Sequence, residues 1–234
     1  MAERTERCGM IEPLYKDALV RLYQGDAGLT LPHLQGESPA VVLTDAPYFL
    51  WAHIAETCDK DRLDLLKEAE WMSDVFMTTL SWLPLLRYLK PSIAFFFAEP
   101  HYASMYLRVA RYLKWPLVGW WPALRSVPGA DHEEYLLAFA DDWARKYPVN
   151  RRLVETEVPH ALRTNSYGQH KSQDMLRIIL EASPRGLVLD PFCGSGSTLL
   201  AARWLGVPSI GIELDEVIAA ETINRLMLRQ ETTK

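Results

Sequence analysis

The stretch Leu187-Val-Leu-Asp190-Pro-Phe-Cys-Gly194-Ser-Gly196-Ser197-Thr198 decides the fold of this chain. Apolar residues lead to an acidic residue, a loop of small residues follows, and a helix-like run occupies residues 199–205. This order is typical of a buried parallel strand, a tight turn and a helix N-terminus, where α/β folds bind nucleotide-like ligands. The glycines let backbone N–H groups approach such a ligand without a Cβ in the way. No Gly-Lys-Ser or Gly-Lys-Thr ending follows, so the stretch does not match a P-loop.

The rest of the chain alternates between strand-like and helix-like segments. A strand at 208–212 follows the loop and ends at Glu213, a carboxylate that can accept hydrogen bonds from two ribose hydroxyls. Proline and glycine predict a loop from 122 to 129. Apolar runs predict further strands at 19–25, 41–44, 93–98, 117–121 and 134–140, and helices at 71–89, 101–113 and 172–182. This alternation predicts an α/β fold with a mostly parallel sheet and helices on both faces.

Composition limits the class of protein. With 234 residues, of which 49% are hydrophobic and 24% charged, one α/β domain of ordinary size fits. The three cysteines are odd in number and far apart, which argues against a disulfide framework and for a reducing compartment. Neither zinc-like Cys/His spacing nor a signal segment nor a membrane-length apolar run is present. We therefore expect a cytoplasmic protein with no metal, no targeting segment and no membrane partner.

Charge is distributed unevenly along the chain. The net charge of −5 carries no global signature of nucleic-acid binding. Residues 143–186 nevertheless contain eight basic and four acidic side chains, whereas residues 56–74 contain seven acidic and three basic ones. On charge alone, a solvated surface and a local site for a polyanion explain the basic segment equally well.

A second candidate site follows the strand at 41–44, in the sequence Asp45-Ala-Pro47-Tyr48. The carboxyl ends of parallel strands meet at one edge of a sheet, so these residues are predicted to lie near the glycine-rich loop. A planar heterocycle could stack on Tyr48 while Asp45 or the Ala46 carbonyl accepts hydrogen bonds from its amino group. Taken alone, the four residues are explained more simply as a strand-to-loop turn.

Together, and in this order, the motifs resemble the DNA amino-methyltransferases that use S-adenosylmethionine, the N6-adenine/N4-cytosine family in its β-group order. In that family the catalytic Asp-Pro-Pro-Tyr type of motif precedes an Asp-Pro-Phe-x-Gly-Ser-Gly cofactor loop. Further segments match the family in sequence: residues 23–26, 43–48, 86–91, 132–137, 170–173 and 210–215. The resemblance covers most of residues 19–228. It implies a single Rossmann-like methyltransferase domain over 1–234, with a small target-recognition insertion at about 141–169 and a permuted motif order.

The resemblance also implies an activity: transfer of a methyl group from S-adenosylmethionine to N6 of adenine in double-stranded DNA, after the base has flipped out of the duplex. The catalytic residues would be Asp45, Ala46, Pro47 and Tyr48. Aspartate at the first motif position goes more often with adenine, and serine with cytosine. Ala46 stands where the family has proline; it still supplies a carbonyl, but it lacks the ring that fixes φ.

The cofactor site implied by the family combines several segments. Asp26 and Ala27 would lie near the adenine of the cofactor, and Glu213 would bind its ribose. The glycine-rich loop would surround the ribose and the methionine portion, and residues 170–173 would contact the carboxylate. The implied cofactor-binding residues are Asp26, Ala27, Asp45, His170, Ser172, Gln173, Asp190, Phe192, Gly194, Ser195, Gly196, Ser197 and Glu213.

Contacts with DNA are expected from the basic insertion, where arginines could bind phosphates or a guanine edge. The candidate residues are Arg145, Lys146, Arg151, Arg152 and Arg163. A monomer or a homodimer fits the length of 234 residues. The resemblance implies an enzyme encoded by a bacterium or phage and associated with restriction-modification. Alternatives are an N4-cytosine or RNA methyltransferase, and a catalytically silent cofactor- or DNA-binding subunit, which Ala46 would favour.

Overall fold

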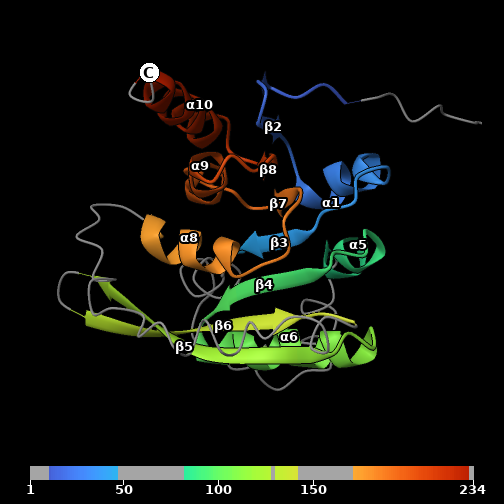
Figure 1. Cartoon of the computed structure of the whole chain (residues 1–234). Coiled ribbons are helices and arrows are strands. Elements are labelled where there is room, and N and C mark those ends of the chain that lie inside the picture. Colours follow the sequence, from blue (N-terminus) through green and yellow to red (C-terminus); the bar gives the residue numbers. More distant parts are fainter. Residues whose placement is uncertain (1–10, 47–81, 128–129, 142–170, 232–234) are drawn as a thin grey trace, which may run out of the picture.

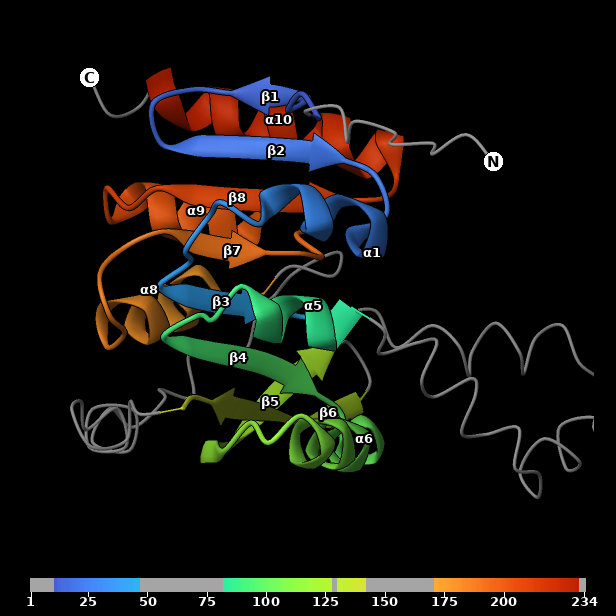
Figure 2. The ribbon, with the colours of Figure 1, turned by 90° about the vertical axis from the view of Figure 1, so that its right-hand side faces the viewer.

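A computed structural model of the chain describes residues 11–46, 82–127, 130–141 and 171–231. The strands of these residues form one sheet in the order β1-β2-β8-β7-β3-β4-β6-β5 (Figure 2). Their bounds are β1 (Tyr15–Lys16), β2 (Val20–Gln24), β3 (Val41–Thr44), β4 (Ile93–Ala98), β5 (Leu117–Val127), β6 (Ala130–Phe139), β7 (Val188–Asp190) and β8 (Ser209–Glu213).

Helices cover both faces of the sheet, as the sequence predicted. Figure 1 shows α8, α9 and α10 on one side of the strands, and residues of α1, α5 and α6 form the core on the other side. The helices are α1 (Ala27–Thr30), the 3-10 helix η1 (Leu31–Leu34), α5 (Trp82–Tyr88), α6 (Pro100–Tyr112), α8 (Gln173–Glu181), α9 (Ser197–Trp204) and α10 (Glu216–Glu231). None of these helices combines the length and apolar character that crossing a membrane requires.

The central strands are apolar throughout because both of their faces are covered. Every residue of β4 is buried. Its side chains alternate between the two faces: Phe96 belongs to the core under α5 and α6, whereas Phe95 and Phe97 belong to the core under α8 and α9. Continuous apolar runs of this kind are typical of parallel strands buried on both sides.

The strand directions confirm a mostly parallel sheet. Strands β2, β8, β7, β3 and β4 run parallel, while β1, β6 and β5 pair antiparallel to their neighbours. The chain passes from β3 towards β4 on one side and from β7 to β8 on the other, so the strand order reverses between β3 and β7. In open α/β sheets, ligands bind at the carboxyl ends of the strands at such a reversal.

One predicted loop is wrong. Residues 122–127, expected in a loop, continue β5, which pairs with β6 along a long hairpin. Pro122 lies within this strand, opposite Tyr135. It is tolerated because β5 is the last strand of the sheet, and an edge strand can carry a residue that has no N–H to donate.

Helix boundaries agree with the predictions in most places. Pro84 lies within α5; residues 71–81 of that predicted helix lie outside the described residues. Helix α10 was not predicted. It begins after Asp215, whose Oδ1 accepts hydrogen bonds from the N–H groups of Val217 and Ile218 at 2.8 and 3.1 Å.

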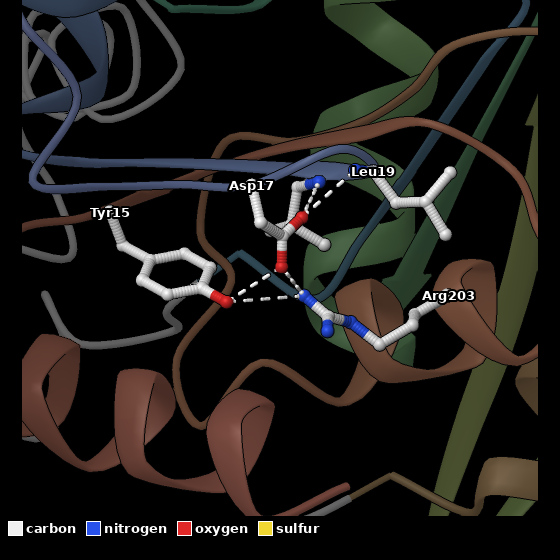
Figure 3. Close-up of polar contacts among 5 residues, drawn as sticks. Tyr15, Asp17, Leu19 and Arg203 are labelled. Atoms are coloured by element: carbon white, nitrogen blue, oxygen red, sulfur yellow. Dashed lines mark hydrogen bonds and ion pairs between the residues drawn. The ribbon is translucent and has the colours of Figure 1, made fainter. Parts of the chain in front are cut away.

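A polar cluster attaches the N-terminal strands to helix α9 (Figure 3). Asp17 Oδ1 accepts from the N–H groups of Leu19 and Val20, at 2.8 Å each. Its Oδ2 accepts from the Tyr15 hydroxyl at 2.6 Å and from the guanidinium of Arg203 in α9. Burial opposes ionisation of Asp17, but these hydrogen bonds outweigh it and lower its pKa to about 2.

Candidate active site at the carboxyl edge of the sheet

Strands β3 and β7 end side by side at the reversal of strand order. They pair in parallel, with Val42 opposite Leu189. Beyond the last paired residues, the hydroxyl of Thr44 donates a 2.7 Å hydrogen bond to Oδ1 of Asp190. Asp45 therefore leaves β3 at the place where the glycine-rich loop leaves β7, and 28% of its side chain is exposed at this edge.

Asp190 is a buried carboxyl group at the start of the loop. Burial raises its pKa to about 6, although hydrogen bonds from Thr44, Thr198 and the Phe192 N–H act in the opposite direction. The negative charge of Asp45 adds to the increase. The side chain thus holds the first turn of the loop while it remains close to protonation at neutral pH.

The loop needs glycine at two positions. Gly194 and Gly196 have φ angles of +49° and +77°, in the left-handed region that residues with a Cβ rarely adopt. A Cβ on Gly196 would also lie 2.6 Å from Cγ2 of Thr222, whereas one on Gly194 would meet no atom within 4 Å. The loop is therefore pressed against helix α10 at Gly196.

Helix α10 and strand β8 hold the loop by hydrogen bonds. The Thr222 hydroxyl donates to the Gly194 carbonyl at 2.6 Å, and the Arg225 guanidinium donates to the Ser195 carbonyl. On the other side, Glu213 Oε2 accepts from the Gly194 N–H at 2.9 Å. Hydrogen bonds from protein groups on both sides thus stabilise the loop conformation.

The residues predicted to bind the nucleoside portion of the cofactor lie around Glu213. Oε1 of Glu213 accepts from the Asp215 N–H at 2.9 Å, and its backbone carbonyl accepts from the Gly25 N–H at 2.8 Å. The second bond brings the end of β2 beside the end of β8. Asp26 there caps α1 by accepting from the Leu29 N–H at 3.1 Å, and Ala27 is buried.

A polar corner lies at the N-terminus of α9. Gly196 occupies the N-cap position and offers no side-chain cap. Nε2 of Gln173 donates to the Ser197 carbonyl at 3.0 Å, while Gln173 Oε1 and the Ser197 hydroxyl are buried without a hydrogen-bond partner among the described residues. Ser172 caps α8, accepting from the Met175 N–H at 3.5 Å. Buried polar atoms are nearly always paired, so this corner suits a ligand with both donors and acceptors.

The chain matches known proteins over part of its length. Residues 154–224 match the model of a family described as DNA methylase. The type II methyltransferase M.EcaI of Enterobacter cloacae is 48% identical over 59 residues, which are 24% of this chain and only 13% of that protein.

Solved structures match over most of the chain. The complex of M1.HpyAVI with SAM superposes with a TM-score of 0.64 at 19% identity, covering 88% of this chain and all (100%) of that one. The cytosine-N4-specific PvuII DNA methyltransferase gives a TM-score of 0.65 at 16% identity, covering 91% and 88%. At these identities the similarity shows the fold, which is the Rossmann-like methyltransferase fold.

Over residues 154–224, the chain is similar to the DNA methylase family. The matched family segment includes the loop, β8 and most of helix α10 up to residue 224. The adenine and cytosine types within the family are not separated by these similarities, since the cytosine-N4-specific structure superposes as well as the others.

The structure brings most of the predicted site to one edge of the sheet. Asp45 and Ala46 directly follow β3. The ends of β7 and β8 are surrounded by the loop residues, Glu213, Ser172 and Gln173. Phe192 is partly buried and packs edge-on against Trp82, with ring centroids 4.8 Å apart. Predicted residues that lie outside the described residues are Pro47, Tyr48, Arg145, Lys146, Arg151, Arg152, Arg163 and His170.

Sequence patterns missed four residues of this site. Thr222 and Arg225 belong to α10, for which the helical spacing of the buried residues Ala219, Thr222 and Leu226 was an available signal. Lys171 forms ion pairs with both Asp45 and Glu134. A glutamate beside the apolar strand residues 135–138 was the signal for Glu134, because a buried charge needs a partner. The described residues contain no group of three or more His, Cys, Asp or Glu side chains that could hold a metal ion.

Proposed function

We propose that this chain is a DNA methyltransferase that uses S-adenosylmethionine and methylates N6 of adenine. The observation that carries the proposal is the Thr44–Asp190 hydrogen bond, which places the candidate catalytic Asp45 beside the glycine-rich loop. A donor site and an acceptor site that share one sheet edge suit direct transfer of a group between two bound molecules.

The residues present fit the cofactor. Its amino-acid end carries an ammonium and a carboxylate, and the polar corner offers the unpaired Gln173 Oε1, the Ser197 hydroxyl and the N-terminus of α9. Glu213, at the tip of β8, is the proposed partner of the ribose hydroxyls, and Asp26 lies towards the adenine end. When bound, the cofactor supplies a methyl group that its sulfonium already makes electrophilic.

The acceptor side is proposed to work by orientation. Asp45 and the Ala46 carbonyl would accept hydrogen bonds from an exocyclic amine and favour a nitrogen whose lone pair points away from the ring. Catalysis would then rest on positioning and electrostatics rather than on a covalent intermediate. Tyr48 is the proposed stacking partner of a flipped base, with Pro47 beside it.

Adenine is favoured over cytosine by aspartate at position 45, since relatives with aspartate at this motif position more often methylate adenine. Double-stranded DNA is the proposed partner, with Arg145, Lys146, Arg151, Arg152 and Arg163 as its candidate contacts. The type II methyltransferase relative supports a role in restriction-modification. N4-cytosine methylation is the second candidate, supported by the cytosine-N4-specific PvuII enzyme, whose fold this chain shares.

The test is transfer of label from S-adenosylmethionine to methylation-free genomic DNA and, in a parallel reaction, to RNA, followed by separation of the nucleosides. We expect labelled N6-methyladenosine. Labelled N4-methylcytosine would replace the adenine assignment with the cytosine one. Cofactor binding without label in DNA or RNA would indicate a catalytically silent subunit. Ala46, which replaces the proline of the family's catalytic motif, is the reason for considering this alternative.

Asp45→Ala tests the proposed catalytic residue. We expect transfer to fall by about 1,000-fold or more, because the amine loses its charged acceptor, while the protein still unfolds in one cooperative thermal transition. Asp174→Ala is the control, since this carboxylate is 81% exposed on α8 and pairs with Arg177 of the same helix. Full activity in Asp45→Ala would refute the proposed role.

A further inference from the structure

A buried lysine lies between two carboxylates at the candidate active site. Nζ of Lys171 is 2.9 Å from Oδ2 of Asp45, and 2.8 and 2.6 Å from Oε1 and Oε2 of Glu134. The ammonium group also lies 4.5 Å from the centre of the Phe97 ring. An ammonium has three N–H donors, and three carboxylate oxygens surround this one. Each N–H donor of the Lys171 ammonium therefore has a carboxylate oxygen within hydrogen-bonding distance.

Burial makes this arrangement energetically important. The side chains of Lys171 and Glu134 are only 11% and 3% exposed, and that of Asp45 is 28% exposed. Charges taken out of water need close partners, and two carboxylates that share one site repel each other. Lys171 offsets both costs, because one cation serves both anions and its remaining face packs on an aromatic ring.

The segment that carries Lys171 also contacts the cofactor loop. Lys171 immediately precedes Ser172, the N-cap of α8, and Gln173 in the first turn donates to the Ser197 carbonyl. Adjacent residues of one segment thus contact the end of β3 and the N-terminus of α9. The position of Asp45 is thereby tied to the same element that holds the cofactor loop.

We propose that Lys171 is a positioning residue: its ammonium, held by Glu134, fixes the orientation of the Asp45 carboxylate towards the target amine. This inference rests on the proposed methyltransferase function and adds a residue to it. It predicts that Lys171 controls the rate of transfer more than the affinity for the cofactor. A purely structural alternative is that Lys171 only neutralises the buried Glu134.

A double variant distinguishes the positioning role of Lys171 from the purely structural one. Lys171→Met leaves Glu134 buried without its ammonium partner, so both transfer and stability should fall. Lys171→Met combined with Glu134→Gln removes the buried anion together with the cation, and its melting temperature should recover most of the loss. If Lys171 positions Asp45, kcat stays low in the double variant; if Lys171 only neutralises Glu134, kcat recovers with stability.

The measurement is kcat and KM for labelled transfer to methylation-free genomic DNA, calculated per cofactor-binding molecule from equilibrium dialysis. This normalisation separates loss of catalysis from loss of folded protein. We expect kcat to fall about 100-fold in Lys171→Met and in the double variant, the cost of a small misplacement at a reacting group. Lys171→Arg should recover kcat to within about tenfold of wild type, since it restores charge and donors. KM for the cofactor should change by less than about threefold throughout.

Arg177→Met, in the helix that follows Lys171, is the matched control. Arg177 is also a largely buried cation that pairs with a carboxylate, Asp174, and lies over a ring, that of Trp204, but it does not contact Asp45. Its loss should leave kcat unchanged. Wild-type kcat in the double variant, or in Lys171→Met, would overturn the positioning role while leaving the proposed function intact. A wild-type protein that transfers no label would overturn both.

Discussion

The hydroxyl of Thr44 donates a 2.7 Å hydrogen bond to Oδ1 of Asp190, across 146 residues of sequence. Both side chains are buried, with Thr44 1% and Asp190 3% exposed. The bond joins the strand that leads to Asp45 with the strand that opens the glycine-rich loop. This contact between neighbouring strands therefore contributes to the alignment of the two halves of the site.

Thr44→Val should lower the free energy of unfolding by about 1–2 kcal/mol, because Asp190 loses a buried hydrogen-bond donor while the side-chain volume is kept. Thr44→Ser keeps the hydroxyl and should retain more of the hydrogen bond. Urea unfolding of the three proteins measures the difference. A valine variant as stable as wild type would show that the bond contributes nothing net.

Asp190→Asn should change how stability depends on pH. The folded pKa of about 6 lies above the ordinary value of 3.8, so between these values the folded state holds a proton that the unfolded state has lost. Wild-type stability should therefore decrease as pH rises from about 4 to about 6, and remain lower above that. Asparagine keeps the acceptor oxygen for Thr44 and cannot ionise, so the variant should escape this decrease.

The gain of Asp190→Asn over wild type should reach on the order of 1–3 kcal/mol above pH 6 and shrink towards pH 4. Urea unfolding without cofactor, over this pH range, gives the two curves. Asp174→Asn, on an exposed site, serves as the control and should follow wild type. Parallel curves for Asp190→Asn and wild type would mean that Asp190 does not titrate in this range.

Gly196→Ala should weaken both the fold and cofactor binding. Alanine at φ +77° costs about 1–2 kcal/mol, and its Cβ would meet Cγ2 of Thr222. Thr222→Ser removes that methyl group but keeps the hydroxyl bonded to Gly194. The double variant should therefore be more stable than Gly196→Ala, as measured by thermal unfolding and by equilibrium dialysis with labelled cofactor.

Two other glycines separate strain from steric contact. Gly194→Ala and Gly206→Ala would also place alanine at positive φ, at +49° and +67°, but neither Cβ would meet an atom within 4 Å. Both should cost about the strain alone, and only Gly194→Ala should weaken cofactor binding. If Thr222→Ser does not relieve Gly196→Ala, the proposed contact with α10 is not the cause.

Asp17→Asn should destabilise the protein at neutral pH, because the neutral side chain loses its ion pair with Arg203. The pKa of Asp17 is lowered to about 2, so its contribution is complete above about pH 4 and is lost as pH falls towards 2. Melting curves of variant and wild type should therefore converge on acidification. A difference that persists at pH 2 would assign the effect to the Tyr15 hydrogen bond instead.

Local patterns predicted much of this fold. The apolar run before Asp190, the two glycines after it and the helix that follows are encoded within residues 187–205, and the structure has them as β7, the loop and α9. The same holds for β3 before Asp45 and for β8 before Glu213. These features depend on neighbouring residues, and short-range periodicity is enough to predict them.

Other features depend on the order of the strands. Pro122 predicts a loop by its own preference, yet it lies in a strand because β5 is at the edge of the sheet. The ion pairs of Lys171 join residues from β6, the end of β3 and the start of α8, which no local pattern brings together.

The residues alone thus determined most of the described elements and their α/β alternation, but not helix α10 or the second half of β5. Only the tertiary structure decided that Thr44 meets Asp190, that Thr222 presses on Gly196 and that Lys171 lies between Glu134 and Asp45. The physical reason is that the two kinds of interaction act over different distances, one along the sequence and the other through space. Backbone preference and hydrophobic spacing act over a few residues, whereas buried hydrogen bonds and ion pairs act over a few ångströms between groups that the sheet brings together.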